Sequence, residues 1–174
     1  MFTTIVVPLD GTDFSETALP LVRKMISERD VKKVLLVRVV TPTPDMAVDT
    51  PVDPASVAAA DAHNRAEAER YLQGIALQIP WNGTEYETAV LFGRVPEVLV
   101  DYANDSRADL LVLSSHARGG VFRLIRGSLA ARMLQSVDMP ILLVGAPGSR
   151  KRTLRFPHIH QSKRKQESIS RQAV

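Results

Sequence analysis

The chain has 174 residues, a length typical of one domain that buries a continuous core without disulfides or metals. It contains no cysteine, which excludes disulfides, thiolate metal sites and a cysteine nucleophile. Its first residues, MFTTIVVPLD, lack the basic segment and cleavage site of a secretory signal, and no apolar run approaches the roughly 20 residues of a membrane helix. These features predict a cytoplasmic protein.

The formal net charge of +3 is distributed unevenly along the chain. Residues 148–174 hold eight lysines and arginines against one acid, a net charge of +7, so subtraction leaves −4 for residues 1–147. The basic segment has few large apolar residues and no periodicity, so it cannot bury enough surface to offset the entropy lost on ordering. We therefore predict a folded domain over 1–147 and a disordered basic tail over 148–174.

Apolar and helix-like segments alternate in the first part of the domain. A strand is predicted over 2–9, and Asp13 and Glu16, three residues apart, predict a capping pair that opens a helix. A β-branched run over 34–40 predicts a buried strand, followed by a loop rich in proline and aspartate. The residues that share the apolar face of the first helix are Ala18, Leu21, Val22 and Met25.

The same alternation continues to the end of the domain. A long alanine-rich helix is predicted over roughly 54–79, with an apolar stripe formed by Ala58, Ala62, Ala66, Leu72 and Ile75. The next elements are a strand over 86–91, a turn at Gly93, and a helix with Pro96 near its first turn and Val98, Leu99, Tyr102 and Ala103 facing inward. The last three are a strand over 109–114, a helix over 128–137 and a strand over 139–145.

Five strands thus alternate with helices, and the strands are apolar throughout rather than at every second residue. This pattern is typical of a parallel sheet covered by helices on both faces, so we predict a doubly wound α/β fold. Such sheets bind ligands at the carboxyl ends of their strands, where the winding direction reverses. The candidate site therefore lies in the loops after the first, second and fourth strands.

The loop after the fourth strand, SSHARGGVFRLIRGS at 114–128, has a composition suited to binding an anion. Glycine-rich loops that end at a helix N-terminus turn backbone N–H groups toward phosphate oxygens. The Walker pattern is absent, because Arg126 precedes Gly127 and no lysine follows it, which argues against P-loop hydrolysis. No nucleophile elbow, dinucleotide fingerprint or metal-binding histidine pair is present in the domain.

Four segments of the chain, in their order and spacing, resemble the universal stress protein family across nearly all of residues 2–145. They are IVVPLDGTDFSETAL, LLVRVV, GRVPEVLVDYANDSRADLLVLSSH and GSLAARMLQSVDMPILLV. The resemblance implies a flavodoxin-like, adenine nucleotide alpha hydrolase-like sheet of strand order 3-2-1-4-5. It also implies a homodimer paired through the fifth strand, here Ile141 to Val144.

In the nucleotide-binding branch of that family, a G-x-x-G-x9-G-[ST] pattern after the fourth strand holds the phosphates and ribose of ATP, and the ends of strands one and two grip the adenine. Carried over by position, the closing pair is Gly127 and Ser128, while the first two glycines are replaced by Ser114 and Ala117. The implied contacts with ATP, with or without Mg²⁺, are Pro8, Leu9, Asp10, Val39, Leu113, Ser114, Ala117, Arg118, Gly127, Ser128 and Leu129.

The two missing glycines leave two functions open. Losing two amide contacts, at about 1 kcal/mol each, would lower affinity very roughly thirtyfold, which weakens an ATP site without abolishing it. The first hypothesis is therefore a stress-response protein that binds ATP as a regulatory ligand, with at most slow hydrolysis and no catalytic residue. The alternative, favoured by Ser114 and Ala117, is a dimeric interaction module without nucleotide.

Plainer interpretations also apply to single residues and to the tail. Asp10 is equally suited to capping the first turn, and Val39 is a residue of a strand end. The eight cations of 148–174 would bind nucleic acid or an acidic partner weakly and with strong salt dependence, whereas a solvated extension needs no partner.

Overall fold

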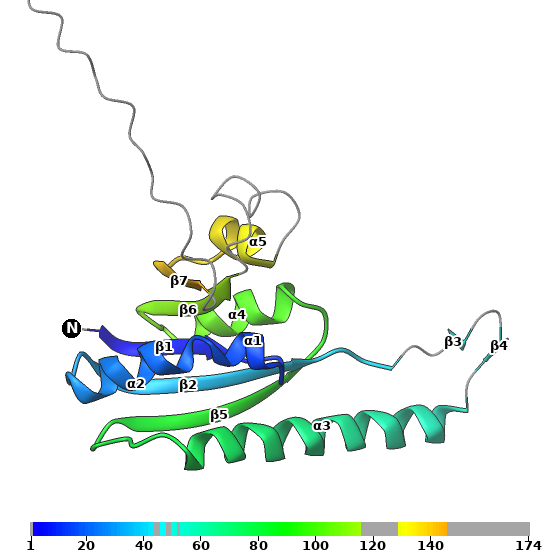
Figure 1. Ribbon diagram of the computed structural model, residues 1–174. Helices are drawn as coiled ribbons and strands as arrows, with labels where there is room; N and C mark the ends of the chain where they lie inside the picture. The colour runs from blue at the N-terminus through cyan, green and yellow to red at the C-terminus, as the bar shows by residue number, and fades with distance from the viewer. Residues whose placement is uncertain (1, 44–45, 48–49, 52, 116–128, 146–174) are drawn as a thin grey trace, which may run out of the picture.

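The computed structural model describes residues 2–43, 46–47, 50–51, 53–115 and 129–145. Within them, five parallel strands form one sheet in the order β5-β2-β1-β6-β7 (Figure 1). Counted along the chain, this is the order 3-2-1-4-5, so the predicted topology is confirmed. The strands are β1 (Phe2–Pro8), β2 (Val31–Val40), β5 (Glu85–Phe92), β6 (Leu110–Ser115) and β7 (Ile141–Gly145).

Helices cover both faces of the sheet, as the sequence predicts. Successive strand residues point to opposite faces, so Ile5 and Val7 belong to one core cluster and Val6 to the other. The Ile5 cluster packs against α2 (Leu19–Ser27) and α3 (Pro54–Leu77), and the Val6 cluster against α4 (Glu97–Asp105) and α5 (Leu129–Ser136). Because both faces are covered, the central strands are apolar throughout.

The start of the first helix differs from the prediction. The N-cap of α1 (Asp13–Glu16) is Thr12, whose Oγ1 accepts a hydrogen bond from the Ser15 N–H at 3.2 Å. Asp13 therefore lies one position inside the helix, where its negative charge is still favourable near the N-terminus. The predicted capping pair is wrong because the threonine hydroxyl already fills the cap. Helix α1 ends with Thr17 as its C-cap, and α2 begins at Leu19.

Helix α3 has nearly the predicted bounds, with Asp53 as its N-cap. Its carboxyl half packs on the sheet and buries Ala68, Leu72 and Ile75. Its amino half extends past the carboxyl edge of the sheet (Figure 1), so the predicted apolar stripe is wrong there: Ala58, Ala62 and Ala66 are exposed. Two short strands that the sequence did not predict, β3 (Met46–Ala47) and β4 (Thr50–Pro51), pair antiparallel before this helix.

Three predicted features lie outside the described residues. They are the loop 116–128, the basic tail 148–174 and the predicted ligand contacts Ala117, Arg118, Gly127 and Ser128. Among the helices that the structure describes, none combines the length and the apolar character needed to span a bilayer.

Candidate functional site

A pocket of about 150 Å³ opens at the carboxyl edge of the sheet. It lies where β1, β2 and β6 end, and β1 is the strand from which the chain winds first toward β2 and later toward β6. This is the switch point at which doubly wound sheets bind ligands. The lining residues are Pro8, Leu9, Asp10, Phe14, Ser15, Val37, Val39, Val95, Leu99, Leu113 and Ser114.

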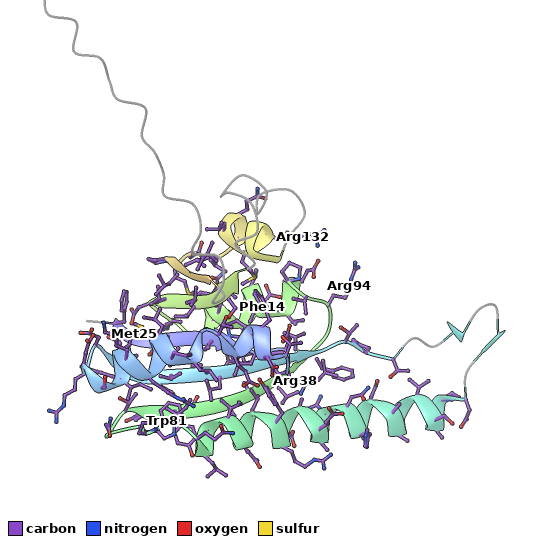
Figure 2. All side chains as sticks on the ribbon, viewed as in Figure 1. Phe14, Met25, Arg38, Trp81, Arg94 and Arg132 are labelled. Carbon is purple, nitrogen blue, oxygen red and sulfur yellow. The ribbon has the colours of Figure 1, made fainter. Side chains whose placement is uncertain are left out.

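Apolar side chains make most of the pocket wall. Val37, Leu99 and Leu113 are buried and belong to the core cluster on the α4 side of the sheet. Phe14 extends from α1 toward α4 (Figure 2) and supplies an aromatic ring to the wall. An apolar cavity of this volume is large enough to hold one small aromatic ring. The pocket therefore suits a flat ring, with any polar substituents directed to its polar side.

Asp10 supports the turn that follows β1. Its Oδ1 accepts hydrogen bonds from the Thr12 backbone N–H at 2.9 Å and from the Thr12 hydroxyl at 2.6 Å. Its own N–H donates to Ser15 Oγ at 3.2 Å. Partial burial raises the pKa of the Asp10 carboxyl. The hydrogen bonds that the carboxylate accepts, first those from Thr12, together lower the pKa by more than burial raises it, so it lies below its ordinary value. Asp10 is therefore ionised at neutral pH.

Gly11 continues this turn in a conformation that favours glycine. Its φ is +86°, and an added Cβ would lie 3.2 Å from the guanidinium carbon of Arg38. Arg38 lies between β2 and α3 (Figure 2), with its guanidinium 5.1 Å from the centre of the Tyr71 ring. The Tyr71 hydroxyl donates to Glu16 Oε1 at 2.9 Å. These contacts fix the turn and α1 against α3.

Ser114 fixes the same turn from the other side. Its hydroxyl donates to the carbonyl oxygen of Ser15 at 2.8 Å and accepts a hydrogen bond from the Thr17 hydroxyl at 3.1 Å. The Thr17 hydroxyl in turn donates to the carbonyl oxygen of Phe14 at 2.7 Å. Ser114 therefore joins the end of β6 to α1.

Six of the predicted contacts lie together in this pocket: Pro8, Leu9, Asp10, Val39, Leu113 and Ser114. Leu129 is the first residue of α5. The sequence analysis missed five lining residues, namely Phe14, Ser15, Val37, Val95 and Leu99. Val37 was predictable, because it shares a strand face with Val39 two positions later. Val95 and Leu99 follow β5, whereas the sequence predicted the site in the loops after the first, second and fourth strands.

The described residues were also compared with the groupings of side chains that hold metal ions. Among residues 2–115 and 129–145, less the gaps already given, no three histidine or acidic side chains are grouped so as to hold a metal ion.

The sheet order and the position of the pocket define a class: doubly wound α/β proteins with a ligand site at the carboxyl edge. A universal stress protein in complex with cAMP has this fold, with a TM-score of 0.55 and 19% identity over 84% of this chain and 98% of that one. A universal stress protein family protein from Arabidopsis thaliana with AMP bound gives a TM-score of 0.57 and 15% identity, over 84% and 93% of the two chains.

Sequence comparison is more specific than this likeness of fold. The profile of the universal stress protein family matches residues 1–145. Universal stress protein MJ0531 of Methanocaldococcus jannaschii is 26% identical over 147 residues, which are 84% of each chain. The chain therefore belongs to the universal stress protein family.

Proposed function

We propose that this chain is a cytoplasmic stress-response protein that binds an adenine nucleotide, ATP, as a regulatory ligand between the carboxyl ends of β1, β2 and β6. The observation that carries the proposal is the pocket itself, which combines apolar and aromatic walls with Asp10 and Ser114 on one side. Two proteins of the same fold, with cAMP and AMP bound, support a nucleotide as the ligand class.

In this proposal the adenine ring occupies the pocket. Val39 lies near the end of β2 and Leu113 near the end of β6, on either side of β1, and Phe14 of α1 lines the same pocket, so the ring is enclosed by apolar groups. The volume accommodates one ring system and not the whole nucleotide, so the ribose and phosphates extend beyond it. The phosphates, with or without Mg²⁺, are assigned to Arg118, Gly127, Ser128 and the start of α5 by the family resemblance.

A pocket-filling substitution tests this assignment. Val39→Phe places a ring where the adenine is proposed to bind, so we expect ATP affinity to fall at least about tenfold, because that change corresponds to only about 1.4 kcal/mol. Isothermal titration calorimetry and equilibrium dialysis measure the affinity. Thr88→Phe, at an exposed position of β5 outside the pocket, is the matched control and should bind ATP normally. Equal affinity in all three proteins, or no retention of any adenine nucleotide by the wild type, would contradict the proposal.

The alternative function, a dimeric interaction module, is favoured by a different part of the molecule. β7 is an edge strand of the described sheet, and Leu142 on it and Leu134 on α5 are 36% and 52% exposed. Unpaired edges and exposed apolar residues favour association with another copy. We propose a homodimer through Ile141 to Val144, which is compatible with nucleotide binding. Sedimentation velocity that finds only monomer at high concentration would contradict it.

The tail 148–174 is proposed as a separate segment that the pocket does not require. Its net charge of +7 supports salt-dependent contact with nucleic acid or an acidic partner. Comparing ATP affinity and DNA retention before and after its deletion separates the two roles.

A further inference from the structure

Strand β5 forms the edge of the sheet opposite the proposed dimer contact. It pairs with β2 along its whole length, from Glu85 to Phe92, and no described strand pairs with its outer side (Figure 1). The side chains of residues 85–88 are all exposed. An open edge offers backbone N–H and C=O groups to another extended segment, and native proteins usually cover or protect such an edge.

The amino half of β5 has different chemistry on its two faces. Glu85 and Glu87 lie two positions apart and therefore on one face. Glu87 pairs with Lys33 at 2.6 Å, whereas no described basic side chain forms an ion pair with Glu85. On the other face the ring of Tyr86, which is 45% exposed, stacks on that of Trp81 with centroids 4.3 Å apart (Figure 2). The edge therefore suits an extended segment that carries cations on one face and a guanidinium on the other.

The tail contains a run of residues with this alternation. Lys163, Arg164 and Lys165 are consecutive. In an extended conformation such a run places its two lysines on one face and its arginine on the other. Paired with β5, the lysines lie opposite the two glutamates and Arg164 lies over the ring of Tyr86. The match holds for parallel and for antiparallel pairing, because the lysines and the glutamates have the same spacing of two positions.

This run is far enough along the chain to reach β5. The register of the sheet puts Gly145, the last described residue, level with Leu91. Tyr86 is four strand spacings across and five residues back from there, a straight distance of about 25 Å. A path over a layer of helices adds about 10 Å at each end. An extended chain spans about 60 Å from Gly145 to Lys163 but only about 23 Å from Gly145 to Arg152.

We propose that residues 163–165 of the chain's own tail pair with the outer edge of β5, with the two lysines against the two glutamates and Arg164 on the ring of Tyr86. The inference goes beyond the proposed function, since no step of it involves a nucleotide. The tail lacks the apolar residues to build a core of its own, so it orders only where it meets this surface. The acidic partner of the tail is then the domain to which it is attached.

Hydrogen exchange in the full chain, followed by NMR, tests this pairing. We expect the outward N–H groups of residues 85–88 to exchange about five- to tenfold more slowly at low salt than in 1 M NaCl, because salt screens the contacts between lysine and glutamate. Lys163→Glu combined with Lys165→Glu should abolish this difference. The matched control, Arg150→Glu combined with Arg152→Glu, changes the charge equally but lies too close to Gly145 to reach β5, so it should keep the difference.

A charge exchange adds a positive result to the test. Combining the two lysine substitutions with Glu85→Lys and Glu87→Lys should restore the protection. Equal exchange in the wild type and in the double lysine variant would overturn the proposal, and so would loss of protection in the arginine control. Protection that grows with protein concentration would assign the edge to a second copy, and protection that requires added DNA would assign the tail to nucleic acid. Either result would overturn the pairing within one chain. The tail variants leave residues 1–147 unchanged, so their folding is not in question.

Discussion

Two hollows lie on the α4 side of the sheet, and the larger one is the poorer candidate for a ligand site. The second hollow, of about 400 Å³, lies beside the amino-terminal parts of β1, β2 and β5 and the end of α4. In it Lys33 Nζ lies 2.6 Å from Glu87 Oε1, and Ser106 Oγ donates to the Ala103 carbonyl. Polar and charged side chains, Asp105 among them, make most of the lining of this hollow, whereas apolar side chains make most of the wall of the carboxyl-edge pocket. An apolar lining at the ends of the strands, rather than volume, makes the carboxyl-edge pocket the better site for a flat ring.

Helix α4 contributes Leu99 to the carboxyl-edge pocket and Tyr102 and Asp105 to the second hollow, so displacing it should affect both. Gly93, which leads into this helix, has a φ of +149°, and an added Cβ would lie 2.5 Å from Val98 Cγ1. We expect Gly93→Ala to lower the free energy of unfolding by about 3 kcal/mol, from backbone strain and overpacking together. Urea unfolding measures the loss.

Gly74→Ala is the matched control for that substitution. Gly74 lies within α3, where an added Cβ would meet nothing within 4 Å. Alanine is the better helix former, so we expect a gain of up to about 1 kcal/mol. If both substitutions destabilise the protein equally, the close contact at Gly93 is not what limits α4.

The Asp10 carboxylate allows the carboxyl-edge pocket to be tested through pH. The pKa of Asp10 in the folded state lies below its ordinary value of 3.8, so its contribution to stability is complete above that pH and is lost as the pH falls through the lowered pKa. Because Asp10 is largely exposed, we expect Asp10→Asn to cost only about 0.5 to 1 kcal/mol at pH 7 and less at pH 3. Urea titrations of wild type and variant at both pH values measure the difference, and the same loss of stability at each pH would refute this expectation.

The smallest effect is expected in the larger hollow. Glu87 raises the pKa of Lys33, but both side chains are substantially exposed, so their pairing contributes little to stability. Lys33→Met should therefore change ATP affinity by less than about twofold, as expected for a distant and independent site. A large loss of affinity in this variant would mean that the two hollows are coupled through α4.

The fold was predictable from sequence because its main determinant is local. Continuous apolar runs such as 34–40 mark strands covered on both faces, and the long helix begins at Pro54, just after its Asp53 cap. The capping error at Asp13 came from choosing between adjacent residues that are both good caps. The exposure of Ala58 depends on where the sheet ends, which no local pattern contains.

Only part of the site was predictable, because some of its residues are placed by local sequence and others by tertiary packing. Residues at strand ends, such as Asp10 and Val39, follow from the topology. The role of Ser114 depends on Ser15 and Thr17, which are 99 and 97 positions away in the chain. Phe14 and Leu99 reach the pocket only because α1 and α4 pack over the same strand ends. Tertiary packing of this kind leaves no periodicity or spacing in the sequence.

The division of α3 into a packed half and an exposed half has a consequence for local stability. Residues 54–67 form about 20 Å of helix, at 1.5 Å per residue, and none of them is buried. A helix of that length without tertiary support is marginal in water. Amide hydrogens there should therefore exchange with deuterium far sooner than those around Leu72, so that one continuous helix opens to solvent from one end while the other stays protected.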